Sequence, residues 1–481
     1  MRILIHGINF SPELTGIGKY SGEMAEWLAA QGHEVRVVTA PPYYPQWRIA
    51  DGYANEWSRG EGHDCRSGFN PTCRDESRPT LNNGSLVVFR CPLWVPAKPS
   101  GLKRVLHLAS FALSSFPIML WQIFWRPDVV WVVEPPLFCA PQAWLVARLS
   151  GGKAWLHIQD YEVDAAFDLG LLKGKLLRGL VAAGERWLMR RFDRVSTISQ
   201  RMLDRAWAKG VAPERAVLFP NWVDLRGLRA QASGLKKTGL RTEDLGLSET
   251  GQSGYRVELG IAADAVVALY SGNMGGKQGL EILAQVAKIA ANCRSGLSVR
   301  CSGFSPAQPE PTPSGCNPTS RDESRPTPEV VFVFCGNGAG RGELVAQCAG
   351  LQNVRFMDLQ PLERLDELLT FADIHLLPQR ADAADLVMPS KLTGMLASGR
   401  PVVATAYQGT ELASVVEACG LVVPPEQPQA LLAAISTLAK DAALRARLGA
   451  AGRAYAEANL DREAVLKKFE TELKAVTREK R

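Results

Sequence analysis

Residues 385–412, DLVMPSKLTGMLASGRPVVATAYQGTEL, carry the pattern that decides the fold. A helical run over 391–397 ends at Gly399-Arg400-Pro401, and 401–405 is a short apolar, β-branched run typical of a covered parallel strand. Ser390 stands where an N-cap would, so the free N–H groups and the dipole at this helix start predict an anion site. Because any parallel βα sheet contains such a unit, the rest of the chain must decide whether it binds a ligand.

The composition is that of an ordinary globular protein. The 481 residues are too many for one compact core, so two domains are expected. Hydrophobic residues make up 46% and charged residues 22% of the chain, typical of a soluble protein. The net charge of +6 suits phosphorylated ligands or an anionic membrane surface, whereas no basic run with interleaved aromatics points to nucleic acid. The ten cysteines form no Cys-x-x-Cys pair and no metal-like cluster, which predicts reduced thiols.

Two apolar segments bear on the compartment. The first five residues already form a strand pattern followed by His6-Gly7, so no signal peptide is predicted and a cytoplasmic protein is expected. The run 105–125 is almost long enough to span a bilayer, but His107, Gln122, three serines and Pro117 argue against a span. We interpret it as a buried or partly exposed helix, with a helix lying on a membrane surface as the alternative.

A first series of βα units opens the chain. Strand 2–5, a loop containing Gly16 and Gly18, helix 19–30 and strand 35–39 form a βαβ unit. The two glycines either let backbone amides approach a phosphate or only permit the turn. An NAD-binding domain is disfavoured because the second strand ends without an acidic residue.

The same series contains the candidate for chemistry. His157 falls near the end of a strand within 153–162, the ligand-binding edge of an open parallel sheet. Asp160 and Glu162 follow, placed to orient the histidine or to bind sugar hydroxyls. A lone histidine more often has a structural role, and this alternative stays open. Residues 173–194 predict an amphipathic basic helix.

A second series follows a linker. Strand 265–270 leads into a glycine-rich loop with Gly272, Asn273 and Lys277 before a helix over 280–291, a pattern that favours a phosphate cradle. Strand 330–334 and Gly336-Asn337-Gly338 repeat the plan. We therefore predict an α/β protein with two Rossmann-like domains facing across a cleft, an architecture suited to a nucleotide-bearing ligand. The predicted bounds are 1–225 for the first domain, 226–260 for the linker, 261–455 for the second domain and 456–481 for a C-terminal helix.

Two polar segments are near-copies of each other. Residues 69–80 and 316–327 share the pattern NPT-x-RDESRPT, and the two copies are too far apart and too few for a repeat fold. We interpret them as insertions, about 60–80 and 295–328, looped out between elements. Excision of 67–80 and 303–327 is expected to leave the fold intact.

Six short motifs together carry a family resemblance. The chain resembles the retaining glycosyltransferases of family 4, which have the GT-B fold, and among them the bacterial colanic acid and exopolysaccharide branch. The motifs are TGIGKY at 15–20, GHEV at 32–35, HIQD at 157–160, SGNMG at 271–275, PSK at 389–391 and ASGRPVVA at 397–404.

The resemblance implies a reaction and a site. It implies transfer of a sugar from a nucleotide-sugar donor to a polyprenyl-diphosphate-linked glycan at the inner membrane face, with fucose from GDP-fucose as the expected donor. His157, with Asp160, is expected beside the transferred sugar, and neither a cofactor nor a metal ion is expected. The predicted donor-binding residues are Gly16, Gly18, Gly272, Asn273, Lys277, Gly336, Asn337, Pro389, Ser390 and Lys391.

The chain also departs from the family pattern. Many relatives have arginine where Asn273 stands and lysine where Gln278 stands. Two glutamates common in relatives correspond here to Leu386 and Gly394. The remaining alternatives are a GT-B nucleotide-sugar epimerase and a non-catalytic scaffold for polysaccharide assembly.

Overall fold

The computed structural model describes residues 1–13, 16–61, 85–97, 101–161, 175–225, 254–275, 278–294, 329–381 and 389–479. The near-copy segments and most of the predicted linker lie outside these residues. The chain divides into two compact units. Unit 1 combines Met1–Trp222 with Arg462–Arg481, and unit 2 combines Val223–Asp385 with Pro389–Asp461. The predicted boundary at residue 455 falls inside a helix of unit 2, and the helix belonging to unit 1 begins only at Arg462.

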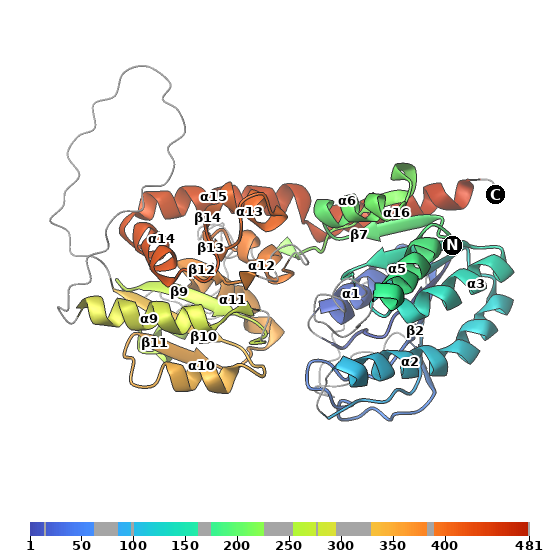
Figure 1. Ribbon diagram of the computed structural model, residues 1–481, viewed down its shortest axis with the longest axis horizontal. Coiled ribbons are helices and arrows are strands. Elements are labelled where there is room, and N and C mark those ends of the chain that lie inside the picture. The colour runs from blue at the N-terminus through green and yellow to red at the C-terminus, as the bar shows by residue number, and fades with distance from the viewer. Residues whose placement is uncertain are drawn as a thin grey trace, which may run out of the picture. The chain divides into compact units, whose positions relative to one another are not determined.

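A mainly parallel sheet of eight described strands forms the centre of unit 1 (Figure 1). Its order is β3-β4-β2-β1-β5-β6-β7-β8, and only the β3–β4 pair within it is antiparallel. The strands are β1 (Arg2–His6), β2 (Glu34–Thr39), β3 (Ser58–Glu61), β4 (Ser85–Arg90), β5 (Val129–Glu134), β6 (Lys153–Ile158), β7 (Arg194–Thr197) and β8 (Ala216–Leu218). Every residue of β5 and β6 is buried, as the near-continuous apolar runs of strands covered on both faces predict.

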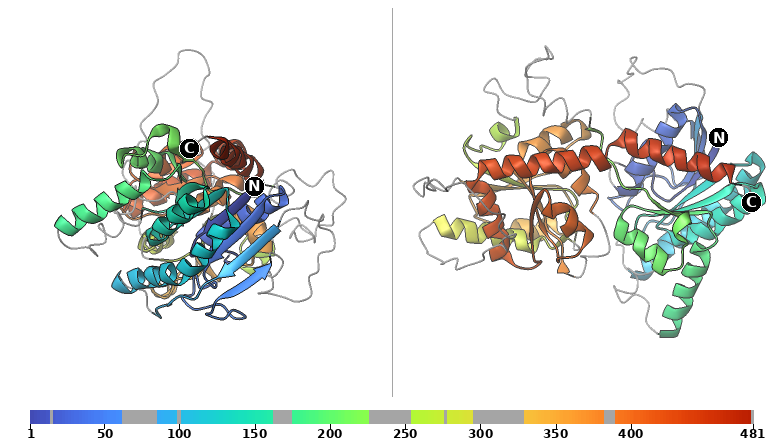
Figure 2. Two further views of the ribbon diagram at one scale, coloured as in Figure 1. Left: turned by 90° about the vertical axis from the view of Figure 1, so that its right-hand side faces the viewer. Right: turned by 90° about the horizontal axis from the view of Figure 1, so that it is seen from above.

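Helices cover both faces of this sheet. α2, α3, α5 and α6 contribute to the apolar cluster on one face, and α1 and α16 to the cluster on the other. Figure 2 shows α16, in dark red, lying close to α1. The helices are α1 (Gly16–Ala30), α2 (Gly101–Gln122), α3 (Ala140–Ser150), α5 (Lys175–Met189), α6 (Gln200–Ala208) and α16 (Arg462–Arg478).

Unit 2 contains a parallel sheet of six described strands in the order β11-β10-β9-β12-β13-β14. The strands are β9 (Val266–Ser271), β10 (Val330–Cys335), β11 (Val354–Met357), β12 (Ile374–Leu377), β13 (Val402–Thr405) and β14 (Gly420–Val423). The helices around them are α8 (Gly254–Glu258), α9 (Glu281–Arg294), α10 (Arg341–Gln347), α11 (Leu365–Phe371), α12 (Lys391–Ala397), α13 (Glu411–Glu417), α14 (Pro428–Lys440) and α15 (Ala442–Asn459). Two parallel sheets, each with helices on both faces, confirm the predicted α/β class.

The stretch that suggested this fold forms the predicted elements. α12 and β13 have the expected bounds to within one residue, and Gly399 ends the helix with a φ of +71°. The capping prediction is wrong: Ser390 has helical dihedral angles and its side chain accepts no capping hydrogen bond. Because α12 has only seven residues and no side-chain cap, its start alone is weak support for an anion site.

The long apolar run forms α2, continued by a 3-10 turn, Ile123–Trp125. Within the described chain, this segment is the one long and apolar enough to cross a membrane, although core helices of soluble proteins satisfy the same criterion. Two of its polar side chains are buried against the sheet of unit 1: Ser115 contacts His6 at 3.1 Å, and Gln122 accepts from Arg36 at 3.0 Å. These buried contacts support the interpretation as a helix docked on the sheet.

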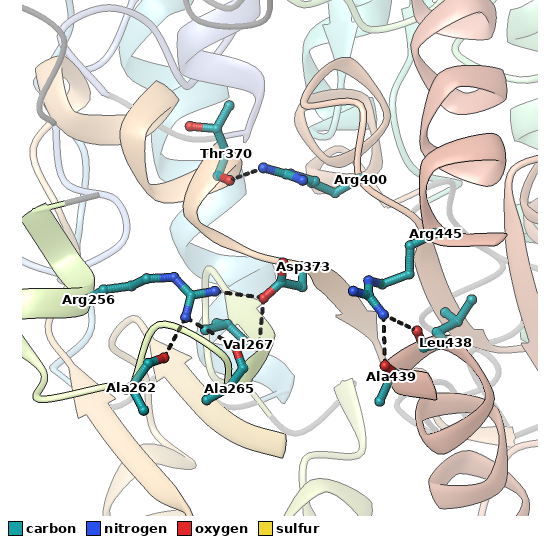
Figure 3. Close-up of polar contacts among 10 residues, drawn as sticks. All are labelled: Arg256, Ala262, Ala265, Val267, Thr370, Asp373, Arg400, Leu438, Ala439 and Arg445. Carbon is teal, nitrogen blue, oxygen red and sulfur yellow. Dashed lines mark hydrogen bonds and ion pairs between the residues drawn. The ribbon is translucent and has the colours of Figure 1, made fainter. Parts of the chain in front are cut away.

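Arginine side chains satisfy backbone carbonyls in unit 2 (Figure 3). Arg400 donates to the carbonyl of Thr370 near the end of α11, and Arg445 donates to the carbonyls of Leu438 and Ala439 near the end of α14. The last carbonyls of a helix have no partner within the helix, so such contacts stabilise its end.

Asp373 joins two strands at the amino edge of the same sheet. Its Oδ2 accepts from the backbone N–H of Val267 and from Arg256, both at 2.8 Å (Figure 3). Arg256 also donates to the carbonyls of Ala262 and Ala265. The carboxylate therefore fixes the segment before β9 to the start of β12.

We expect Asp373→Ala to lower the free energy of unfolding of unit 2 by about 2 kcal/mol, because it leaves a backbone donor and a largely buried guanidinium without their acceptor. Asp373→Asn keeps an acceptor for Val267 and should cost about half as much. Denaturant unfolding of the two variants and the wild type measures this. Equal losses in both variants would show that the hydrogen bond to Val267 contributes nothing.

Candidate active site

In an open parallel sheet, ligands bind at the carboxyl ends of the strands. In unit 2, Lys391 extends to this edge, where its Nζ donates to the hydroxyl of Tyr270 at 2.9 Å. The same hydroxyl donates to the carbonyl of Asn273 at 2.6 Å. A Cβ built on Gly272 would lie 3.3 Å from this Nζ. Lys391 and Tyr270 therefore hold an ammonium group directly against the loop that follows β9.

Two glycine loops interlock at the same edge. The backbone N–H of Met274 donates to the carbonyl of Asn337, and that of Gly340 to the carbonyl of Met274. A Cβ on Gly336 would lie 2.0 Å from the carbonyl oxygen of Gly272, and one on Gly338 would lie 2.6 Å from the side-chain oxygen of Asn273. These glycines are thus required for close packing of the loops after β9 and β10. The structure brings Gly272, Asn273, Gly336, Asn337 and Lys391 together, and their contact with a donor stays a prediction.

The remaining donor-binding predictions of this unit have different outcomes. Lys277 lies outside the described residues. Gln278, which replaces a lysine of many relatives, accepts from the backbone N–H of Gly275 and so closes the loop on itself. Pro389 and Ser390 directly precede α12, and the Pro389 carbonyl accepts from the backbone N–H of Leu392. Their contact with a donor stays a prediction.

The electrostatics of Lys391 are unusual. Burial lowers the pKa of its ammonium to about 8. Burial also raises the pKa of Tyr270, so that this hydroxyl stays protonated. An anion bound beside this partly desolvated lysine would stabilise its protonated form. The lysine therefore favours an anionic ligand at this edge. Tyr270 was not predicted from the sequence, since a tyrosine at a strand end has no distinguishing pattern.

In unit 1, the predicted glycines lie in the first turn of α1, which begins three residues earlier than expected. Gly16 has a φ of +62°, which explains why a glycine is needed there. A Cβ on Gly18 would lie 2.6 Å from the buried side chain of Glu13. The second glycine is therefore explained by packing within the protein, and its approach to a phosphate stays a prediction. Glu13 was missed in the sequence because acids are frequent in loops.

His157 is buried in the core of unit 1, with 1% of its surface exposed. Its ring stacks on Trp131 at 5.2 Å between centroids and meets Phe219 edge-on. Nδ1 lies 2.8 Å from the Ser196 hydroxyl, and Nε2 lies 2.9 Å from the side-chain nitrogen of Gln159. Burial lowers the pKa of His157 to about 3, so the ring is neutral, with Nδ1–H donating and Nε2 accepting. Both nitrogens are therefore engaged, and a contact with the transferred sugar stays a prediction.

His157→Ala is expected to lower the free energy of unfolding of unit 1 by about 3 kcal/mol, from the cavity and from the orphaned Ser196 and Gln159. Denaturant unfolding measured beside nucleotide binding tests this. A variant as stable as the wild type would refute the structural role, and any loss of its activity would then be chemical.

Asp160 lies beyond the end of β6, on the ligand-binding edge. Burial raises the pKa of Tyr44, and the charges of Glu13 and Asp160 raise it further, while Arg104 lowers it. Asp160 is thus electrostatically coupled to the loop after β2. Among the described side chains, no group of three or more His, Cys, Asp or Glu is arranged to hold a metal ion.

Comparison with known proteins connects both units to one family. The family described as "Glycosyl transferase 4-like domain" matches residues 15–222, and "Glycosyl transferases group 1" matches residues 318–441. One relative is WcaI of Escherichia coli strain K12, whose name describes a glycosyl transferase of colanic acid biosynthesis. It is 40% identical to this chain over 477 residues, which cover 98% of each chain. The chain belongs to the family 4 glycosyltransferases.

Solved structures of low identity show the same GT-B fold. Sucrose-phosphate synthase of Thermosynechococcus elongatus has a TM-score of 0.65 at 15% identity, covering 99% of this chain and 98% of its own. A glycosyltransferase of Rickettsia africae has a TM-score of 0.61 at 11% identity, with 100% of both chains covered. These structures confirm the predicted fold, while the two family matches and the 40% identical relative confirm the predicted family and transferase activity. For a family 4 glycosyltransferase, the Lys391 edge of unit 2 is the natural candidate for donor binding.

Proposed function

We propose that this glycosyltransferase moves a sugar, with retention of configuration, from a nucleotide-sugar donor to a lipid-linked oligosaccharide in exopolysaccharide biosynthesis of the colanic acid type. GDP-fucose is the proposed donor. The observation that carries the donor part is the Lys391 ammonium held by Tyr270 against the Gly272 loop. The pathway part is supported by the 40% identity to a relative named for colanic acid biosynthesis.

The chemistry requires stabilisation of negative charge. Breaking the bond between a sugar and a diphosphate leaves an oxocarbenium-like sugar and a leaving group with additional negative charge. A preorganised cation about 4 Å from that charge contributes about 4 kcal/mol at an effective dielectric constant of 20. Lys391 supplies such a cation without a metal ion, which is the role we propose for it.

Retention follows from the direction of attack. The acceptor hydroxyl attacks on the face that the diphosphate leaves, and an oxygen of the departing phosphate accepts its proton. Exclusion of water limits hydrolysis of the donor. His157 and Asp160 stay candidates for contact with the sugar on the unit 1 side.

The proposed acceptor carries a polyprenyl chain, so the enzyme has to reach it at a membrane surface. The outer face of α2 has large apolar side chains at helical spacing, including Leu106, Leu113 and, just beyond the helix, Phe124, of which Leu113 is 76% and Phe124 83% exposed. No acidic residue occurs in residues 101–125, and Lys103 and Arg104 lie at the start of the helix. These features are typical of a helix that lies in a membrane interface.

The neighbouring helix α5 and the residues just after it add positive charge. Arg186 of α5 and Arg190 and Arg191 just beyond its end, here called the α5 arginines, surround the exposed Trp187 in a shallow surface hollow. Trp187 contacts Trp144 of α3, and α2 also contacts α3, so these helices form one continuous layer on the sheet. We propose that this layer docks on the anionic inner leaflet and keeps the enzyme cytoplasmic and peripheral.

Titration of the full chain with GDP-fucose, GDP, UDP-glucose and UDP-galactose, followed by isothermal calorimetry, tests the donor assignment. Binding of GDP-fucose at least tenfold tighter than either UDP-sugar is expected, with product analysis showing no isomerised nucleotide sugar. Release of an isomerised nucleotide sugar without acceptor would establish the epimerase instead, and binding without any turnover would favour the scaffold.

A further inference from the structure

The loop after β1 buries an acidic side chain that the proposed chemistry does not use. Glu13 has only 6% of its surface exposed, although it lies in a loop at the ligand-binding edge of unit 1. Buried carboxylates are rare unless they are hydrogen-bonded. Its contacts therefore indicate what it holds in place.

Among the described residues, the hydrogen-bond partners of the carboxylate are all donors. Oε1 accepts from the backbone N–H groups of Tyr43 and Tyr44, both at 3.1 Å, and Oε2 accepts from the side-chain amide of Asn9 at 2.9 Å. Burial raises the pKa of Glu13 to about 7, while these donors and Arg90 lower it. One side chain thus joins the loop after β1 to the loop after β2.

The first turn of α1 packs against the side chain of Glu13. A Cβ on Gly18 would lie 2.6 Å from both Cβ and Oε2 of Glu13. A Cβ on Gly22, one turn later, would lie 2.7 Å from Cβ of Ser11. The position of the helix start therefore depends on where Glu13 lies.

Arg90, at the end of β4, completes the arrangement. Its Nη1 donates to the carbonyl of Ala40 and its Nη2 to the carbonyl of Ser11, both at 2.9 Å. Glu13 accepts from backbone donors of the loop after β2 and from the Asn9 side chain in the loop after β1, whereas Arg90 donates to backbone carbonyls of both loops. Glu13 and Arg90 together hold the two loops in a fixed relative position.

We propose that Glu13 is a positioning residue, whose carboxylate holds the start of α1 and the Tyr43–Tyr44 backbone together as one preformed surface for the acceptor glycan. The inference rests on the proposed function for the identity of the ligand. In this proposal the start of α1, with Gly16 and Gly18, contacts the acceptor and not the donor diphosphate, so a defect in the surface affects the acceptor and leaves nucleotide binding by unit 2 unchanged.

Two variants of the full chain separate positioning from charge. Glu13→Ala is expected to speed amide hydrogen exchange at Tyr43 and Tyr44 at least tenfold and to raise the KM for the acceptor at least tenfold, with the donor KM within twofold of the wild type. Glu13→Gln should restore both readouts to within threefold, because its amide oxygen accepts from the two backbone groups while the Asn9 amide turns to present its oxygen. Glu56→Ala, which changes an exposed glutamate of unit 1, is the matched control.

Exchange at Tyr43 and Tyr44 unchanged in Glu13→Ala would overturn the proposal, as would donor and acceptor KM values that rise together. If Glu13→Ala does not fold, Glu13→Asp replaces it, since the shorter side chain cannot reach the two amides and predicts the same changes. A wild-type enzyme that transfers no sugar would refute the proposed function alone, because the exchange measurement still decides whether Glu13 holds the two loops.

Discussion

Lys391→Met is expected to lower kcat/KM for the nucleotide-sugar donor by about 100- to 1000-fold. The substitution removes the ammonium that Tyr270 holds against the Gly272 loop but keeps a side chain of similar length. The affinity for the free nucleoside diphosphate should fall as well, since the same cation binds the product. Steady-state transfer rates and calorimetry with GDP measure the two effects.

The pH dependence of donor affinity tests the role of Lys391 independently. Because burial lowers the pKa of Lys391 to about 8, the wild type should lose donor affinity as the pH rises through 8. The pKa of Lys391 is about 8 in the folded chain and ordinarily 10.5. At pH values between these two, the unfolded chain binds more protons at Lys391 than the folded chain does. The titration of Lys391 therefore favours the fold as the pH rises, so a loss of binding through this residue does not arise from a loss of stability at Lys391.

Two further variants serve as controls. Tyr270→Phe removes the hydroxyl that accepts from Lys391 and should produce an intermediate loss of about tenfold, as for one charge-assisted hydrogen bond. Lys288→Met changes an exposed lysine of unit 2 and should leave all rates unchanged. Lys391→Met should unfold no more easily than the wild type at pH 7, since it removes a desolvated charge. Full activity of Lys391→Met would refute its role as the donor cation.

The double substitution Leu106→Ser and Leu113→Ser is expected to weaken binding to anionic vesicles by about 30-fold or more. Each leucine exposes a side chain whose burial in the membrane interface is worth about 1–2 kcal/mol, and the polar replacements remove that gain. Both side chains are exposed on unit 1, so the fold should be unaffected. Sedimentation with vesicles containing 30% phosphatidylglycerol, about the anionic fraction that attracts basic proteins, measures the partition coefficient.

The matched control for this helix is Val257→Ser, an exposed apolar side chain of unit 2. It should bind the vesicles like the wild type. Neutral vesicles should bind the wild type about tenfold less tightly, because Lys103, Arg104 and the α5 arginines then contribute little. Equal binding of the double variant and the wild type would show that α2 is not the membrane-facing element.

The sequence was most informative where local pattern and tertiary environment agree. The run 391–405 has helical periodicity, a Gly-Arg-Pro stop and β-branched residues, and it forms α12 and β13 as predicted. The described cysteines, Cys91, Cys139, Cys335, Cys348 and Cys419, are all buried and free, as expected for apolar surroundings. The exposed strand β3 was not predicted, because SRGE has no apolar alternation and depends on its pairing with β4.

The site was harder to predict because side-chain contacts depend on distant residues. Ser390 has the residue type of an N-cap, but its dihedral angles are already helical. His157 stands near the strand end as expected, yet its side chain faces the aromatic cluster beneath α16. Gly18 looks like a phosphate-binding glycine, but the structure explains it through Glu13. Tyr270 and Glu13 became visible only once their partners were placed.

The most direct test of the account is transfer of labelled fucose from GDP-fucose into a lipid-linked acceptor fraction by the full chain, with the wild type, Lys391→Met and Lys288→Met side by side. The account predicts label in the lipid fraction with the wild type and Lys288→Met, and at least 100-fold less with Lys391→Met, in line with the loss of one transition-state cation. Label transferred equally well by Lys391→Met would contradict the assignment of the donor site, and label that moves only from a different nucleotide sugar would contradict the proposed donor.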